Sequence, residues 1–227
     1  MTILLSFAAK PIRHCSAKGY GKGVTTEHYF SEDPQAPLRT TTLSLTLRGH
    51  SVTMQSASGT FSPGHLDTGT AVLLKYAPAA PETGNFLDLG CGWGPLTLAL
   101  ALESPGAHIW GVDVNDRALE ITRGNAANAR AANITCARPG DVPPDVAFDL
   151  IWSNPPIRVG KQELHALLSA WLPRLSPTGE AWLVVAKKLG ADSLQEWINR
   201  GEAGEFIASR WETSRGYRVI RVVRQQS

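Results

Sequence analysis

A short glycine-rich segment at residues 85–94 (NFLDLGCGWG) constrains the fold more than any other part of the chain. An apolar run interrupted by Asp88 leads into three alternating glycines and then into Pro95, which begins a leucine-rich stretch. This order is typical of a buried strand, a tight loop and a helix with proline in its first turn. Because glycine has no Cβ, such a loop can turn sharply and approach a ligand closely. The alternative is an ordinary strand-to-helix turn.

The spacing of the glycines indicates which ligand the loop would take. A dinucleotide site needs G-x-G-x-x-G, but here Leu96 and Thr97 stand where its third glycine is required. Asp88 would also be a poor neighbour for a phosphate. A nucleoside with a cationic or amino-acid tail suits the segment better, which points to S-adenosylmethionine (SAM).

Composition limits the function without choosing it. The chain has 227 residues, enough for one sizeable domain and an appendage. A net charge of +2 permits a nucleic-acid partner without indicating one. Cys15, Cys91 and Cys136 form no CxxC pattern. We therefore expect no disulfide framework and no metal, and a reducing, cytoplasmic location. The apolar patch within residues 1–9 is too short to span a membrane, so no membrane partner is expected.

From residue 85 onward, strand and helix patterns alternate. The expected strands after the first cover residues 107–112, 134–137, 147–152, 180–186, 205–211 and 217–224. Helical patterns lie between them, including residues 117–129 and 162–172. The alternation predicts an α/β fold, a seven-stranded and mostly parallel sheet with helices on both faces.

Two acids stand where parallel strands end. Asp113 follows the second expected strand, a place where a carboxylate can accept hydrogen bonds from a ribose diol. Its alternative role is to cap the next helix. Asp141 follows the third strand and could meet an adenine amine, although an aspartate before Val-Pro-Pro is also ordinary loop chemistry.

The fourth expected strand ends in Ser153, Asn154, Pro155 and Pro156. The two prolines fix φ and remove two N–H donors, so the loop presents carbonyl groups with little conformational freedom. The amide oxygen of Asn154 adds a further acceptor. Such a set suits an exocyclic amine, whose lone pair it would aim at an electrophilic methyl group without needing a strong base. A rigid turn after a strand is the alternative.

The N-terminal third is different in character. Residues 1–26 form either a flexible basic arm that contacts phosphates or an unstructured start. Alternating leucines and polar residues from 42 to 54 predict a β-hairpin, a short cap within residues 27–80 that precedes the main domain at 81–227. Residues 61–70 (FSPGHLDTGT) read as a lid that contacts ligands through Phe61, Asp67 and Thr70, or as a helix cap (Asp67) and a packing residue (Phe61).

Basic residues gather in two further places. Arg158, Lys161 and His165 lie near the start of the helix at 162–172, where they could contact RNA phosphates or form a solvated face. Five arginines crowd the last two strands, as a basic rim for nucleic acid or an ordinary solvated edge; they are Arg210, Arg215, Arg218, Arg221 and Arg224.

Taken together, these segments resemble the class I SAM-dependent methyltransferases, with their Rossmann-like seven-stranded sheet. More narrowly, they are similar to the small methyltransferase domain of the RsmC type, the ribosomal RNA guanine-N2 methyltransferases. The resemblance covers most of residues 27–227, through EHYF, FSPGHLDTGT, LDLGCGWGPL, GVDVNDRALEITRGNAAN, SNPPIRVGK and GYRV. NPPIRVGK is the specific motif, whereas the glycine loop marks only the superfamily.

The resemblance implies methyl transfer from SAM to an exocyclic amine, guanine N2 of 16S (small-subunit) rRNA, with the rRNA or the small ribosomal subunit as partner. It implies the following site residues: Asn154, Pro155 and Pro156 for catalysis; Thr70, Asp88, Gly90, Cys91, Gly92, Asp113, Val114, Asp141 and Asn154 for the cofactor; and Phe61, Asp67, Ile157, Arg158, Lys161 and Tyr217 for the substrate.

Two departures from the pattern keep other functions open. Ile157 stands where DNA-adenine and protein-glutamine methyltransferases usually carry an aromatic residue, so a flipped base would need Phe61 or Tyr217 as its stacking partner. Longer family members also have an extra domain for RNA recognition, and here only a short cap is expected. The alternatives are a small-molecule methyltransferase, a protein-glutamine methyltransferase and a non-catalytic RNA-binding factor. The oligomeric state stays open, with a monomer as one possibility.

Overall fold

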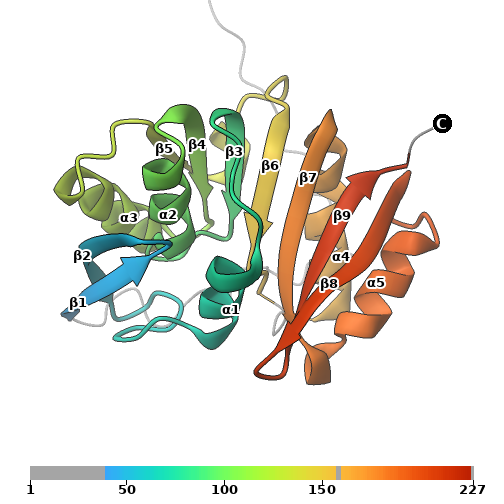
Figure 1. Cartoon of the computed structure of the whole chain (residues 1–227), viewed down its shortest axis with the longest axis horizontal. Coiled ribbons are helices and arrows are strands. Elements are labelled where there is room, and N and C mark those ends of the chain that lie inside the picture. Colours follow the sequence, from blue (N-terminus) through green and yellow to red (C-terminus); the bar gives the residue numbers. More distant parts are fainter. Residues whose placement is uncertain (1–38, 157–159, 226–227) are drawn as a thin grey trace, which may run out of the picture.

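A seven-stranded sheet in the order β5-β4-β3-β6-β7-β9-β8 forms the centre of the protein (Figure 1). The computed structural model describes residues 39–156 and 160–225. The predicted basic arm (1–26) and the EHYF segment lie outside them. The strands are β3 (Thr83–Leu89), β4 (Gly106–Val112), β5 (Ile134–Ala137), β6 (Phe148–Ser153), β7 (Leu175–Ala186), β8 (Phe206–Ser214) and β9 (Tyr217–Arg224).

The strand directions agree with the predicted class of sheet. The neighbours from β5 to β7 run parallel, while β9 pairs antiparallel with both β7 and β8. One strand boundary differs clearly from the prediction. β7 begins at Leu175, five residues before the expected start at residue 180. Pro177 and Gly179 are unfavourable in strands, so the sequence does not indicate that the strand begins here. Gly179 is nevertheless required at its position. A Cβ at Gly179 would lie 2.6 Å from the carbonyl oxygen of Phe148 on the neighbouring strand.

Helices cover both faces of the sheet (Figure 1). On one face lie α1 (Thr68–Tyr76), α2 (Pro95–Glu103) and α3 (Asp116–Asn128), and on the other lie α4 (Lys161–Trp171) and α5 (Ala191–Asn199). A hydrophobic core layer lies between the sheet and the helices on each face. Leu73 and Leu100 belong to the layer under α1 and α2, and Leu168 and Trp197 to the layer under α4 and α5. No helix in the described part of the chain is both long and apolar enough to cross a membrane.

The predicted hairpin is present as a separate two-stranded sheet of β1 (Thr40–Leu47) and β2 (His50–Ala57). Its turn residues Arg48 and Gly49 both have positive φ, as a tight hairpin turn requires. The outer edge of β2 is held by Asn125 of α3. The Asn125 amide accepts from the backbone N–H of Gln55 at 2.7 Å and donates to its carbonyl at 2.8 Å.

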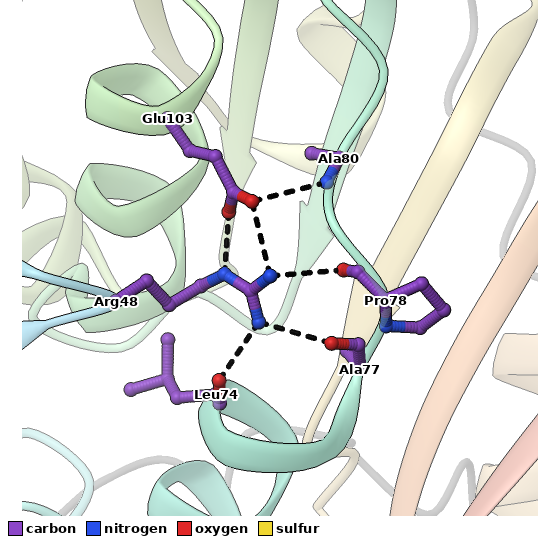
Figure 2. Close-up of polar contacts among 6 residues, drawn as sticks. All are labelled: Arg48, Leu74, Ala77, Pro78, Ala80 and Glu103. Carbon is purple, nitrogen blue, oxygen red and sulfur yellow. Dashed lines mark hydrogen bonds and ion pairs between the residues drawn. The ribbon is translucent and has the colours of Figure 1, made fainter.

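Arg48, at the tip of the hairpin, fixes the cap to the main domain (Figure 2). Its Nε and Nη2 donate to the carboxylate of Glu103, at 2.5 and 3.0 Å. The remaining N–H groups donate to three carbonyl oxygens at the end of α1 and just beyond it, those of Leu74, Ala77 and Pro78, at 2.8–3.1 Å. All five donors of the guanidinium are therefore used.

Replacing Arg48 by alanine is expected to lower the free energy of unfolding by roughly 2–4 kcal/mol, because three carbonyls lose their donor and Glu103 keeps only the N–H of Ala80. Urea denaturation would measure the loss. Arg48→Lys is the matched control, since lysine keeps the charge and the strained backbone position but cannot make the forked contacts. A lysine variant as stable as the wild type would contradict the role of the fork.

Candidate active site

The glycine loop between β3 and α2 has the conformation that its sequence predicts. Gly90, Gly92 and Gly94 have φ angles of 79°, 56° and 90°. A Cβ at Gly94 would lie 2.6 Å from the Thr122 side chain, so the last glycine is required for packing. Within the described part of the chain, a Cβ at Gly90 would meet nothing within 4 Å, and Gly90 is exposed. The loop is therefore open to a ligand at Gly90, which fits the cofactor site predicted there.

Asp88 is fully buried beneath this loop. Its Oδ2 accepts from the backbone N–H of Thr97 at 2.8 Å and from the Thr97 hydroxyl at 2.6 Å, while its Oδ1 is buried with no partner among the described residues. Burial raises the pKa of Asp88 to about 7. The Asp88 carboxyl group therefore holds the first turn of α2 against β3. Direct contact with the cofactor stays a prediction.

The raised pKa of Asp88 predicts a pH dependence of stability. In the folded state its carboxyl retains a proton up to about pH 7, whereas the unfolded chain loses it near pH 4. Stability should therefore fall as pH rises from about 4 to about 7, and then level off. Asp88→Asn should remove this contribution, so the unfolding free energy of the variant relative to the wild type should rise by up to about 4 kcal/mol across that window, about 1.4 kcal/mol for each unit of pKa shift. Urea denaturation at several pH values would measure it, and a difference that is constant with pH would contradict the assignment.

Asp113 joins the end of β4 to the glycine loop. Its Oδ2 accepts from the N–H of Gly92 and its Oδ1 from the N–H of Asn115, both at 2.9 Å. Burial raises its pKa. The cap of α3 is Asn115, whose side chain accepts from Arg117 and Ala118, so Asp113 is not a mere helix cap. The backbone N–H of Val114 also donates to this carboxylate, which leaves one of its four lone pairs for a ribose hydroxyl.

Three further predicted cofactor residues lie around these acids. Val114 follows Asp113 and is 40% exposed, an apolar surface at the carboxyl end of β4. Asp141 is exposed in the single turn that follows β5. The Cys91 side chain is buried, and burial raises the pKa of its thiol well above its usual range. Cys91 therefore shapes the loop as a neutral apolar residue.

Asn154 is held by two residues from the predicted lid. Its Nδ2 donates to Asp67 Oδ2 at 2.8 Å and to Thr70 Oγ1 at 3.1 Å. Because both amide hydrogens are used, the Asn154 carbonyl oxygen is the atom left to accept from a ligand. Pro155 and Pro156 continue the loop from there. Asp67 Oδ2 also accepts from the N–H of Thr70 at 3.0 Å, so Asp67 caps α1 and orients Asn154 at once.

Two aromatic residues lie beside this group. A Cβ at Gly69 would be 2.9 Å from the Tyr217 ring, so Tyr217 packs against the first turn of α1 next to Asp67. Phe61 is 54% exposed, and its Cβ lies 3.7 Å from the position of a Cβ at Gly92. Phe61 thus stands over the glycine loop. The lid, the glycine loop and Asn154 therefore meet at the carboxyl edge of the sheet.

The basic residues that were predicted to contact RNA differ in their surroundings. Lys161 is exposed at the start of α4, and Ile157 and Arg158 lie outside the described residues. The imidazole of His165 stacks on Trp197, with ring centroids 3.7 Å apart, which supports a packing role. Three of the five C-terminal arginines are engaged within the fold: Arg218 with Asp192, Arg221 with Glu180, and Arg224 with the carbonyls of Pro173 and Leu175.

Sequence reasoning missed the residues of α3 that hold the lid. Asn115 Nδ2 donates to the carbonyl of Gly59 at 2.7 Å, and Arg117 donates to that of Ser58 at 3.0 Å. Both contacts fix the chain just before Phe61. Asn115 makes its contact with a partner 56 positions away, which no local pattern encodes. The only sequence signal was its place in the segment GVDVNDRALEITRGNAAN.

Comparison with known proteins shows which family the chain belongs to. Residues 51–206 match the model of the methyltransferase small domain. The chain belongs to this family. The prediction of a methyltransferase, made from the resemblance, is therefore confirmed at the level of the family.

The proteins that are similar in sequence to this chain differ in length. YbxB of Bacillus subtilis, an uncharacterized protein, is 36% identical over 174 residues, which are 75% of this chain and 87% of YbxB. Ribosomal RNA small subunit methyltransferase C of Aeromonas hydrophila is 34% identical over 126 residues, which are 54% of this chain and 35% of that protein. The chain therefore spans about a third of that longer relative.

A solved structure shows the same fold. Thermus thermophilus RsmC, a 16S rRNA N2 G1207 methyltransferase in complex with AdoMet and guanosine, superimposes with a TM-score of 0.69 at 24% identity. The match covers 86% of this chain and 53% of the RsmC chain. The class I methyltransferase fold predicted from the sequence is confirmed.

Proposed function

We propose that this protein transfers a methyl group from SAM to the exocyclic N2 amine of a guanine in small-subunit ribosomal RNA. The observation that carries the proposal is the geometry of Asn154, whose amide nitrogen is fixed by Asp67 and Thr70. That arrangement leaves a carbonyl oxygen as a preset acceptor for an amine. The family and the relatives named for rRNA methylation support an RNA substrate.

The cofactor supplies an electrophilic methyl group on its sulfonium. Asp113 would accept from its ribose, Val114 would cover its adenine, and the open side of the loop at Gly90 would admit its methionine part. Asn154, together with the carbonyl groups beside Pro155, would accept hydrogen bonds from the target amine and aim its lone pair at the methyl carbon. The amine nitrogen would gain the methyl group as the sulfonium sulfur loses it, and the nitrogen would then release a proton to water. Catalysis is mainly orientation.

The decisive experiment is methyl transfer from labelled SAM to small-subunit rRNA that lacks the modification, both naked and within assembled subunits. Digestion to nucleosides would place the label in N2-methylguanosine if the proposal is correct. Such a substrate would place the enzyme in the cytoplasm, among the ribosomes. Absence of label in every RNA, with SAM binding intact, would contradict the proposal and leave a metabolite or protein acceptor.

A second candidate substrate is large-subunit rRNA. Ribosomal RNA large subunit methyltransferase G of Ectopseudomonas mendocina is 32% identical to this chain over 145 residues, which are 38% of that protein. The same assay with naked and assembled large subunits separates the two candidates. Label confined to large-subunit RNA would keep the reaction and change the substrate.

A further inference from the structure

Three basic residues gather at the carboxyl edge of the sheet, outside the set of site residues described above. Lys187 and Lys188 lie in the single turn Lys187–Leu189 that follows β7, and Arg215 lies in the turn between β8 and β9. The backbone N–H of Lys187 donates to the carbonyl of Gly216 at 2.8 Å, so the two turns are joined. All three residues are exposed. We call Lys187, Lys188 and Arg215 the edge cluster.

The charge of the edge cluster is not cancelled by ion pairs. Asp192, which lies just beyond the cluster in α5, is paired with Arg218 instead. Within the part of the chain that the structure describes, the arginines that do form ion pairs are Arg48, Arg138, Arg200, Arg218 and Arg221. The cluster therefore places three positive charges together, although the whole chain has a net charge of only +2.

Tyr217 borders the edge cluster on both of its turns. In the chain it follows Arg215 and Gly216 directly. In the sheet it pairs with Ala186 of β7, the residue before Lys187. Tyr217 is half-buried, and its position is therefore fixed by the same two strands that carry the cluster.

The ring of Tyr217 also borders the candidate active site. A Cβ at Gly69 would lie 2.9 Å from the Tyr217 ring and 3.0 Å from Asp67 Oδ2, so the ring and this carboxylate are close neighbours. Asp67 in turn accepts from Asn154 Nδ2 at 2.8 Å. A series of direct contacts thus connects the amide proposed to hold the target amine with the edge cluster.

Phosphate groups are the anions that this cluster would meet in an RNA substrate. Contacts from lysine and arginine to phosphate oxygens fix the register and orientation of a nucleic acid, and their contribution to affinity depends on salt. A strand whose guanine reaches Asn154 would carry neighbouring phosphates past Tyr217. Leu189, at the end of the same turn, is 44% exposed and offers an apolar surface to a sugar or base.

We propose that the edge cluster binds phosphate groups of the RNA strand whose guanine is methylated. The inference rests on the proposed function, because it takes the acceptor to be RNA. It assigns a substrate contact to two lysines that no sequence pattern singled out. Of the five C-terminal arginines, only Arg215 belongs to the cluster.

The first test compares Arg215→Glu with Arg130→Glu. Both arginines are exposed in turns and have positive φ, 49° and 56°. Arg130 lies between α3 and the start of β5, at the opposite edge of the sheet. Fluorescence anisotropy would measure binding of a short, fluorescein-labelled single-stranded RNA with SAM present. Arg215→Glu should raise the Kd about 5–10-fold, and Arg130→Glu less than about twofold, although both variants have the same net charge.

The second test replaces Lys187 and Lys188 together by glutamine. Glutamine keeps the backbone N–H that joins the two turns. The slope of log K against log salt should become less steep by about 1.4, the effect of two lost phosphate contacts on a single strand. A merely structural role for the lysines would leave that slope unchanged. SAM affinity, measured separately, should be the same in the three variants and the wild type.

Equal effects of Arg215→Glu and Arg130→Glu on RNA binding would overturn the proposal, and so would an unchanged salt slope in the lysine variant. Loss of methylation of assembled subunits in Arg215→Glu, with naked-RNA binding intact, would also overturn it, because the cluster would then contact a ribosomal protein. The proposed function fails on a different result, the absence of label in every RNA. RNA binding that needs Arg215 would survive that failure, so the two proposals can fail separately.

Discussion

Replacing Asn154 by alanine is expected to lower kcat for RNA methylation about 10²–10³-fold, with the Kd for SAM changed by no more than a few-fold. The Asn154 oxygen is the acceptor that would orient the target amine, and orientation is the main source of catalysis proposed here. The side chain is fixed by Asp67 and Thr70 on α1, so its loss should not disturb the glycine loop. Single-turnover kinetics and SAM titration would measure the two effects.

Thr70→Ser and Thr70→Val form the matched pair for this prediction. Serine keeps the hydroxyl that accepts from Asn154 Nδ2 at 3.1 Å, and valine removes it while keeping the shape of threonine. We expect the serine variant to retain most of the activity and the valine variant to lose about tenfold in kcat, because one of the two fixing bonds is gone. If alanine at Asn154 weakened SAM binding as much as it slowed turnover, the proposed role of Asn154 would be wrong.

These contacts also show what the sequence could predict. The glycine loop, the strands and Asp113 were predicted because their signals are local: glycine spacing, short apolar runs and an acid at a strand end. For Asp67 the sequence left two alternatives, a helix cap or a ligand contact, and the structure shows the cap. Its bond to Asn154 joins residues 87 positions apart, and no local pattern encodes that pairing.

Long-range polar contacts account for what was missed. Arg48 and Glu103 are 55 positions apart, and no local pattern in the sequence pairs them. For the same reason the sequence left two alternatives for the C-terminal arginines, a basic rim for nucleic acid or a solvated edge. Their number suggested a basic rim, but whether an arginine is available to RNA depends on distant carboxylates and carbonyls. Arg218 and Arg221 meet such carboxylates in Asp192 and Glu180.

Asp113→Ala is expected to raise the Kd for SAM about 10–100-fold. The substitution removes the acceptor for the ribose and also frees the N–H of Gly92, which Asp113 holds at 2.9 Å. The glycine loop should then lose the shape that admits the cofactor. At saturating SAM, kcat should fall far less than in Asn154→Ala, because the acceptor for the amine is intact. Calorimetric titration with SAM would measure the change.

The control for Asp113 is Asn115→Ala. It removes the actual cap of α3, whose side chain accepts from Arg117 and Ala118, and should cost about 1 kcal/mol of stability. Asp113 itself is bonded to the Asn115 backbone, which this variant keeps. SAM affinity should therefore change little. If both variants weakened SAM equally, Asp113 would act only by positioning α3. A loss confined to Asp113→Ala would place its carboxylate at the cofactor, because Asn115→Ala removes the cap of α3 and the bond to the Gly59 carbonyl but leaves the contact between Asp113 and the glycine loop.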